Sequence, residues 1–210
     1  MKRLNKYIIE KILINKRYKF NKIKVETRKQ LETIILERYN KNKSFIDLTD
    51  IDISELDDLS YIFYELYSME VVDISGWDTS NVITMDCMFS QCPKLKKIIG
   101  IENLDVSKSE DVSYMFYGGE NLVELDLTNW NPKLLQKTRY MFYGCSNLKI
   151  IKNIENWQLP NIKNVSYMFC NCTKLDVDLS NWDLTKINDS LKEGMVGNSH
   201  ITKNHLPKFT

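Results

Sequence analysis

The sequence predicts an α/β solenoid, a right-handed array of about five to six rungs preceded by an N-terminal helical cap. Each rung is expected to hold a short strand and a short helical or irregular return. Three observations support this prediction: a repeat of close to 26 residues, an apolar alternation typical of a strand within each repeat, and a helix-capping motif near the N-terminus.

A short segment that ends in phenylalanine sets the register of the repeats. Successive phenylalanines lie 26, 27, 26 and 27 residues apart. A degenerate sixth copy of the segment ends at Met195-Val196. The aligned segments are residues 60–63, 86–89, 113–116, 139–142 and 166–169. Because each unit of this size can bury its apolar face only against its neighbours, the repeat indicates a stacked array.

The residues around each phenylalanine predict the elements of a rung. Residues 122–127 read L-x-x-L-x-L, a strand pattern in which alternate side chains face the core. Val112, Met115 and Phe116 lie three and four positions apart, which favours one face of a short helical turn. A tryptophan then closes most repeats, at Trp77, Trp130, Trp157 and Trp182.

The chain divides into a basic N-terminal cap (1–47), the solenoid (48–199) and a C-terminal tail (200–210). Residues 27–30, Thr-Arg-Lys-Gln, have the form of a capping box and predict a helix from about 27 to 40. Residues 7–13 fit another helix, and residues 18–20 fit an edge strand.

Charge is distributed unevenly along the chain. Residues 1–45 hold 14 Lys or Arg and 4 Asp or Glu, a net charge of +10, whereas residues 46–210 hold 15 and 24, a net charge of −9. Such an asymmetry indicates an electrostatic role for one part or attraction between the two.

The repeat resembles the leucine-rich repeat of the BspA type, which reads N-V-x-x-M-x-x-M-F-x-x-C-x-x-L-x-x-L-D-L-S-x-W. One rung matches with Asn81-Val82, Met85, Met88-Phe89 and Cys92, and another with Asn164-Val165, Met168-Phe169 and Cys172. The resemblance covers about residues 48–199 and extends into the cap at residues 47–52. It implies a leucine-rich-repeat-like fold in a surface or interaction protein without known catalytic activity; many members are secreted adhesins.

The residues themselves also argue against catalysis. The histidines, His200 and His205, lie in the tail, and the sequence has no Gly-rich phosphate loop and no metalloprotease or serine-hydrolase motif. Cys92, Cys145 and Cys172 each follow the repeat phenylalanine by three residues, so we expect a column of small buried side chains. We therefore expect no enzyme, no cofactor, no metal site and no small-molecule substrate.

No apolar run is long enough for a signal peptide or a membrane span, which predicts a cytoplasmic protein without a membrane partner. The five cysteines are an odd number, and we expect them to be reduced in that compartment.

Two surfaces are candidates for partner binding. The outward positions of successive strands alternate in charge and are Glu70, Asp73, Lys96, Lys97, Glu124, Asp126, Lys149, Lys152, Asp176 and Asp178. These charges either bind a partner or only pair between neighbouring strands. The second candidate lies in the basic N-terminal cap and mixes basic and aromatic residues, as nucleic-acid-binding surfaces do. Its residues are Lys16, Arg17, Tyr18, Lys19, Phe20, Lys22 and Lys24.

The sequence thus predicts a protein-binding module, an intracellular inhibitor or adaptor that docks on another protein or a ribonucleoprotein. One alternative is a protein that binds RNA or a nucleoprotein through the basic N-terminal cap, and another is a cell-surface adhesin.

Overall fold

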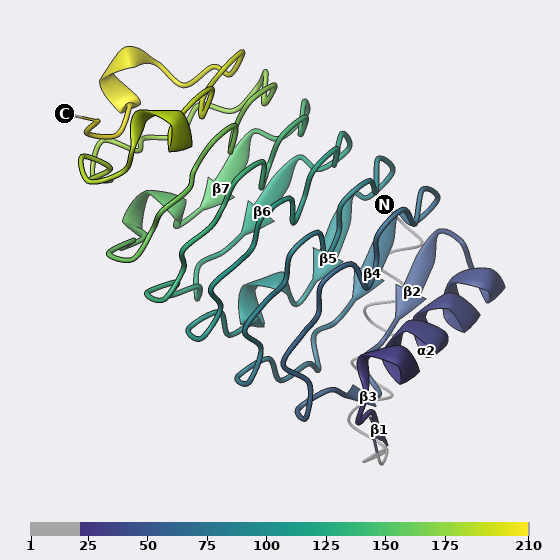
Figure 1. Ribbon diagram of the computed structural model, residues 1–210. Coiled ribbons are helices and arrows are strands. Elements are labelled where there is room, and N and C mark those ends of the chain that lie inside the picture. Colours follow the sequence, from purple (N-terminus) through teal and green to yellow (C-terminus); the bar gives the residue numbers. More distant parts are fainter. Residues whose placement is uncertain (1–21, 210) are drawn as a thin grey trace.

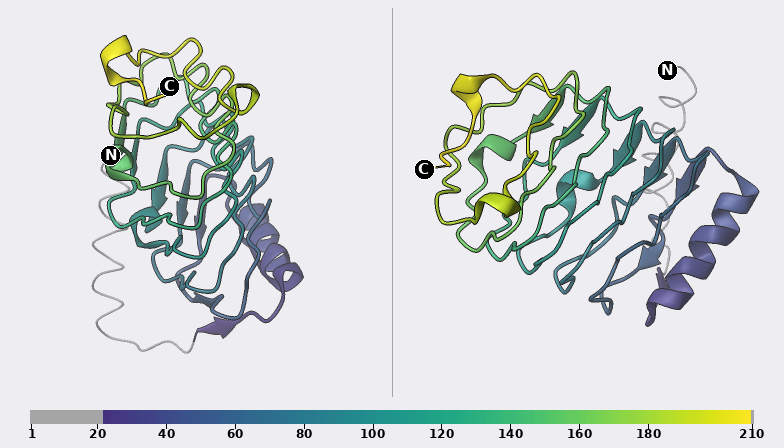
Figure 2. Two further views of the ribbon diagram at one scale, coloured as in Figure 1. Left: turned by 60° about the vertical axis from the view of Figure 1, so that its left-hand side comes forward. Right: turned by 45° about the horizontal axis from the view of Figure 1, so that its top comes forward.

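Equivalent segments of successive repeats lie side by side along one direction in the computed structural model, which describes residues 22–209 (Figure 1). Helix α2 lies at one end of the stack and the C-terminus at the other, as two further views also show (Figure 2). The described part of the chain forms small parallel sheets, few helices and no closed barrel. The strands are β1 (Ile23–Lys24), β2 (Phe45–Asp47), β3 (Ile51–Asp52), β4 (Val71–Asp73), β5 (Lys97–Ile99), β6 (Glu124–Asp126) and β7 (Ile150–Lys152).

Strand pairing follows the repeat length. The sheets are β1-β3, β2-β4-β5 and β6-β7, and all of their pairs are parallel. Along the stack, Phe45 pairs with Val71 and Val71 with Lys97, so each strand pairs with the equivalent segment of the next repeat. Strand β2 therefore brings residues of the segment assigned to the cap into the parallel stack.

The longer of the two repeat lengths interrupts the strand pairing. The repeat from β5 to β6 has an extra residue compared with the repeat from β4 to β5, and the chain leaves β5 through Gly100 (φ 90°) into the 3-10 helix η1 (Ile101–Asn103). A similar helix, η2 (Ile154–Asn156), follows β7, and residues 175–179 of the next repeat form no strand. The extra residue thus interrupts the pairing of β5 with β6. The expectation of a strand in each rung fails at residues 175–179.

The returns are irregular turns and not helical, so the helical alternative for them was wrong. In the first return the amides of Tyr61, Phe63 and Glu65 donate to carbonyls of the next rung, at Asp86, Met88 and Ser90. The intervening amide of Tyr64 donates back to Tyr61. Bonds to a neighbouring rung thus replace the i to i−4 bonds of a helix.

The core is a column of identical side chains from successive rungs. Phe63, Phe89, Phe116, Phe142 and Phe169 are fully buried. Their ring centroids lie 4.9 to 5.8 Å apart, with interplanar angles of 5 to 8°. Trp130, Trp157 and Trp182 form a second stack, with centroids 6.0 and 6.2 Å apart.

The predicted cysteine column is confirmed as part of this core. Cys92, Cys145 and Cys172 are fully buried. Each thiol donates to the carbonyl of a repeat phenylalanine at 3.0 to 3.1 Å, namely that of Phe63, Phe116 and Phe142 respectively. Gly119 occupies the same place in the third rung, where a Cβ would lie 2.9 Å from Leu122.

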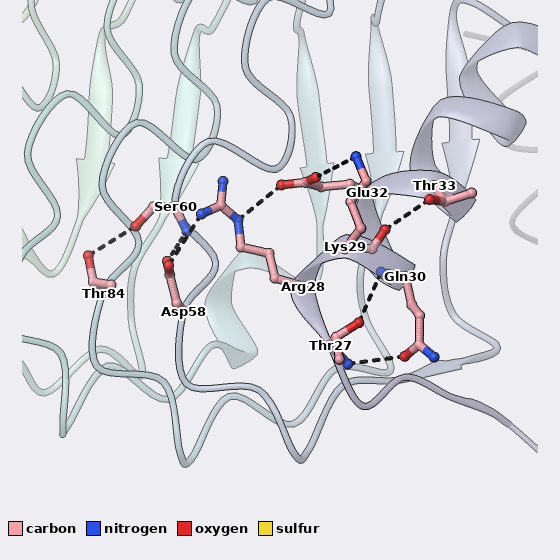
Figure 3. A network of polar contacts seen from close by, with 9 residues as sticks. All are labelled: Thr27, Arg28, Lys29, Gln30, Glu32, Thr33, Asp58, Ser60 and Thr84. Carbon is pink, nitrogen blue, oxygen red and sulfur yellow. Dashed lines mark hydrogen bonds and ion pairs between the residues drawn. The ribbon is translucent and has the colours of Figure 1, made fainter.

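The helix expected near residues 27–40 is α2 (Arg28–Lys41), and both bonds of the Thr27–Gln30 capping box are present (Figure 3). Its residues Leu31 and Ile35 are buried. Arg28 lies 3.3 Å from Asp58, and the Asp58 carboxylate accepts the amide of Ser60 at 2.7 Å (Figure 3). These contacts join the helix to the first return.

No helix of the described residues is long and apolar enough to cross a membrane. The helix and edge strand proposed for residues 7–13 and 18–20 lie outside the described residues.

Candidate protein-binding surface: a ladder of tyrosines

Most of the charged residues predicted on the strands are paired between neighbouring rungs. Glu70 lies 2.7 Å from Lys96, and Lys152 lies 2.7 Å from Glu124 and 3.0 Å from Asp126. The hydrogen bond from Lys96 lowers the pKa of Glu70, and the one to Glu124 raises the pKa of Lys152. The alternating charges therefore pair between neighbouring rungs. Of the two interpretations of this pattern, partner binding or pairing between strands, these contacts fit the second.

Three of the predicted aspartates, Asp73, Asp126 and Asp178, serve local turns. Asp73 is only 4% exposed and accepts hydrogen bonds from the amide and hydroxyl of Ser75, so its place on an outward surface was wrong. Its side chain turns back to close the loop that follows β4. Asp178 accepts the amide of Ser180 in the same way but is exposed.

The remaining predicted residues of this surface differ in their contacts. Asp176 lies 2.9 Å from the ring nitrogen Nδ1 of His205. Lys97 and Lys149 are exposed and form no ion pair with any residue between 22 and 209.

The break between β5 and β6 opens a groove of about 520 Å³ on this face. Several of the predicted residues line it, together with η1: Lys96, Lys97, Glu124, Asp126 and Lys152. The groove is thus rich in side chains that already neutralise one another.

Only two residues of the predicted nucleic-acid surface lie in the described part of the chain. Lys24 pairs with Glu55 at 3.2 Å, and the amine of Lys22 donates to the carbonyl of Gly76. Both cations are thus engaged by their own chain. Lys16, Arg17, Tyr18, Lys19 and Phe20 lie outside the described residues.

A different surface, made of tyrosines in the returns, was missed by the sequence analysis. We call it the tyrosine ladder; its first column is Tyr61, Tyr114, Tyr140 and Tyr167, and its second is Tyr64, Tyr117 and Tyr143. Tyr114 and Tyr140 stack with centroids 4.9 Å apart and planes 3° apart, and Tyr140 stacks on Tyr167 at 4.9 Å. Tyr117 and Tyr143 stack beside them at 5.1 Å.

The backbone of the returns holds these rings in line. The first-column tyrosines have positive φ angles of 55 to 63°, which recur at the same position of each rung. The amide of Tyr114 donates to the carbonyl of Arg139, and that of Tyr140 to Ser166. Backbone bonds between successive rungs therefore set the spacing at which the rings stack.

The ladder is accessible along its length and ends at a glycine. Tyr61 and Tyr64 are 46% and 40% exposed, and the tyrosines of the later rungs are partly exposed. At Gly194, the equivalent position of the sixth copy, a Cβ would lie 2.4 Å from the ring of Tyr167. The last ring thus packs over a residue without a side chain.

The surroundings of two ladder tyrosines favour the neutral phenol. A hydrogen bond with Glu193 raises the pKa of Tyr167, and loss of hydration raises the pKa of Tyr140. Each ring thus offers an apolar face and a hydroxyl that both donates and accepts hydrogen bonds.

The signal for this surface was present in the sequence, because tyrosine precedes the Met-Phe pair in three of the aligned segments. Only the fold shows that this position faces outward while its two successors face the core.

The model of the family described as "Mycoplasma protein of unknown function, DUF285" matches residues 33–151 and again residues 99–209. No curated protein gives a significant match. Among solved structures, a leucine-rich repeat protein from Eubacterium ventriosum ATCC 27560 is similar, with 17% identity and a TM-score of 0.47. The similarity covers 76% of this chain but 44% of that one. The two matches to the family together span residues 33–209, so the chain belongs to the DUF285 family.

Proposed function

We propose that this protein is a non-catalytic protein-binding module whose partner docks on the tyrosine ladder. The observation that carries the proposal is the stack of accessible tyrosine rings on consecutive rungs, from Tyr114 to Tyr167.

Tyrosine is enriched at protein interfaces because one end of it is apolar and the other forms hydrogen bonds. A partner that orders flexible side chains on binding loses conformational entropy with each of them. Here the rings of Tyr114, Tyr140 and Tyr167 are already held by their neighbours in the free protein. Binding at the ladder therefore requires little further ordering.

The strand face is a weaker candidate for the same role. Lysine, glutamate and aspartate are depleted in interface cores, and Glu70, Lys96 and Lys152 are already paired within the chain. A partner would have to compete with these pairs for each charge. We assign the strand face to array stability and the ladder to recognition.

A protein partner also fits the charges around the ladder better than a nucleic acid does. Glu65 follows Tyr64, Asp86 lies beside Tyr61, and Glu193 forms a hydrogen bond with Tyr167. Arg139 lies over the ring of Tyr114. A phosphate backbone requires a continuous positive surface, which these acidic residues interrupt.

In this proposal the chain is the right-handed, helix-capped solenoid predicted from its repeats. The parallel pairing of equivalent segments in successive repeats supports that architecture. Such an array acts by covering a surface of its partner or by holding partners together, as an inhibitor or an adaptor does.

The test is affinity purification of the tagged full-length protein from its native cells, with mass spectrometry. The informative variant is Tyr140→Ser/Tyr143→Ser, which removes two central rings of the ladder. Its matched control is Lys149→Ser/Ile150→Ser, because both residues are exposed on the strand face and Ile150 is 49% exposed. Each variant is first shown to be folded by its thermal unfolding curve.

We expect a protein partner that survives nuclease treatment, is lost with the tyrosine variant and is retained by the control. Loss with the control alone would move the interface to the strand face. Recovery of nuclease-sensitive material only would replace the protein partner by a nucleoprotein.

A further inference from the structure

The tyrosine ladder is interrupted in the second rung, and both columns are interrupted together. Cys87 stands where the first column has tyrosine, and Ser90 stands where the second has it. A depression of about 410 Å³ lies there, which we call the notch; its lining includes Tyr61, Asp86, Cys87, Ser90, Tyr114 and Arg139. Within the described residues, no ring contact joins Tyr61 and Tyr64 to the tyrosines beyond the notch.

The notch has the thickness of one missing ring layer. In the core beneath it, the phenylalanine column continues through the second rung, with Phe89 4.9 Å from Phe63 and 5.8 Å from Phe116. One face of Tyr114 is covered by Tyr140, and the guanidinium of Arg139, which also lines the notch, lies over the ring 5.3 Å from its centroid. An aromatic ring inserted there would continue the ladder at its own spacing.

The backbone of the second rung has the conformation that carries a tyrosine in the other rungs. Cys87 has a φ of 55°, the same as Tyr114, and its amide donates to Ser113 in the way that the amide of Tyr114 donates to Arg139. The second rung therefore lacks this ring because its residue is a cysteine, and not because its backbone differs.

The polar lining of the notch suits a phenol. The hydroxyl of Tyr61 lies beside the Cys87 thiol and the Asp86 carboxylate, and both raise its pKa. The guanidinium of Arg139 lies 5.3 Å from the ring centroid of Tyr114 and has no carboxylate within ion-pair distance in residues 22–209. Asp86 can accept a hydrogen bond and Arg139 can donate one, which matches the two roles of a hydroxyl.

We propose that the notch receives a tyrosine side chain of the partner protein, with its ring in the gap between Tyr61 and Tyr114 and its hydroxyl between Asp86 and Arg139. This inference rests on the proposed function and names the group that the ladder recognises. A phenylalanine would leave both polar groups of the notch without a new bond, and an arginine would meet the like charge of Arg139.

The test uses N-acetyltyrosinamide as the probe and the full-length protein, with saturation-transfer NMR titrations. Cys87→Tyr fills the notch from within, and Ser90→Tyr fills it from the second column should the first variant fail to fold. The matched control is Cys170→Tyr, which makes the same change on the same face but extends the second column at its far end. N-acetylphenylalaninamide and N-acetylargininamide serve as competing probes.

We expect the wild-type protein and Cys170→Tyr to bind N-acetyltyrosinamide, and the filled variants to lose affinity by about tenfold or more. Equal binding by Cys87→Tyr or Ser90→Tyr and the wild type would overturn the proposal. Preference for N-acetylphenylalaninamide or N-acetylargininamide would overturn the choice of tyrosine.

The purified partner separates this inference from the proposed function. A partner that is lost with Tyr140→Ser/Tyr143→Ser but retained by Cys87→Tyr would leave the ladder as the interface and remove the notch from it. Loss of the partner with Cys87→Tyr and not with Cys170→Tyr is the result we expect.

Discussion

Phe142 shows how a single side chain holds two rungs together. Its ring is fully buried and stacks at 5.5 Å on Phe116 on one side and on Phe169 on the other. We expect Phe142→Ala to lower the free energy of unfolding by about 3 to 5 kcal/mol, because it leaves a cavity between two rigid rungs. Urea denaturation followed by circular dichroism measures the change.

The matched control for that substitution is Lys149→Ala, an exposed position of the same repeat. We expect it to change the free energy of unfolding by less than about 0.5 kcal/mol. Similar losses in the two variants would show that the phenylalanine column is not what stabilises the array.

Single residues also show what the sequence could reveal. The cysteine column followed from the position of Cys92 and Cys145 in the repeat, because free cysteine is among the most buried residue types. The tyrosine ladder did not follow, since Tyr140 and Met141 are neighbours in one aligned segment. Whether a residue of an irregular return faces outward depends on its φ angle, which no apolar periodicity encodes.

Among the elements, α2 was predicted with nearly correct bounds and the predicted strand segment 122–127 contains β6, whereas the helical alternative for the returns was wrong. Apolar residues at offsets of three and four, such as Val112, Met115 and Phe116, also arise when tight turns alternate with bonds to the next rung. The amides of Val112 and Phe116 donate to Lys137 and Met141 of that rung, and the amide of Met115 donates back to Val112. Helical spacing therefore does not distinguish a helix from such a coil.

His205 is one of the residues that hold the C-terminal segment to the last rungs. Its carbonyl accepts the amide of Leu179, and its ring lies 2.9 Å from Asp176. The hydrogen bond with Asp176 raises the pKa of His205 above its ordinary value of 6.5. The imidazolium form thus stabilises the folded chain.

A raised pKa in the folded state gives the sign of the pH dependence. The stabilisation by His205 is fully present below the unfolded pKa and is lost as the pH rises through the folded one. We expect His205→Gln to destabilise the protein near pH 5 and to have little effect near pH 9, both approximate values on either side of the histidine range. Thermal unfolding of both proteins at the two pH values measures this difference, and a difference independent of pH would contradict the role of the ion pair.

At the scale of the whole molecule, each rung contacts mainly its neighbours, so stability is a sum of local terms along the stack. The two ends differ in how they are closed. At the first end, α2 buries Leu31 and Ile35 and its Arg38 pairs with Asp50 at 2.6 Å. At the other end, residues 201–209 supply short 3-10 and irregular segments, in which Ile201 and Phe209 are only partly buried.

This asymmetry predicts that the array opens from its C-terminal end. Native-state hydrogen exchange should be faster at the amides of Tyr167 and Phe169, which donate to Glu193 and Met195, than at the amide of Phe63. The bonds of Tyr167 and Phe169, at 2.9 and 2.7 Å, are shorter than the 3.1 Å bond of Phe63, so bond length does not account for faster exchange at the C-terminal end. His205→Gln near pH 5 should accelerate exchange at Tyr167 and Phe169 and leave Phe63 unchanged. Equal exchange rates along the column would instead mean that the rungs unfold as one cooperative unit, in which closure of the C-terminal end has no separate effect.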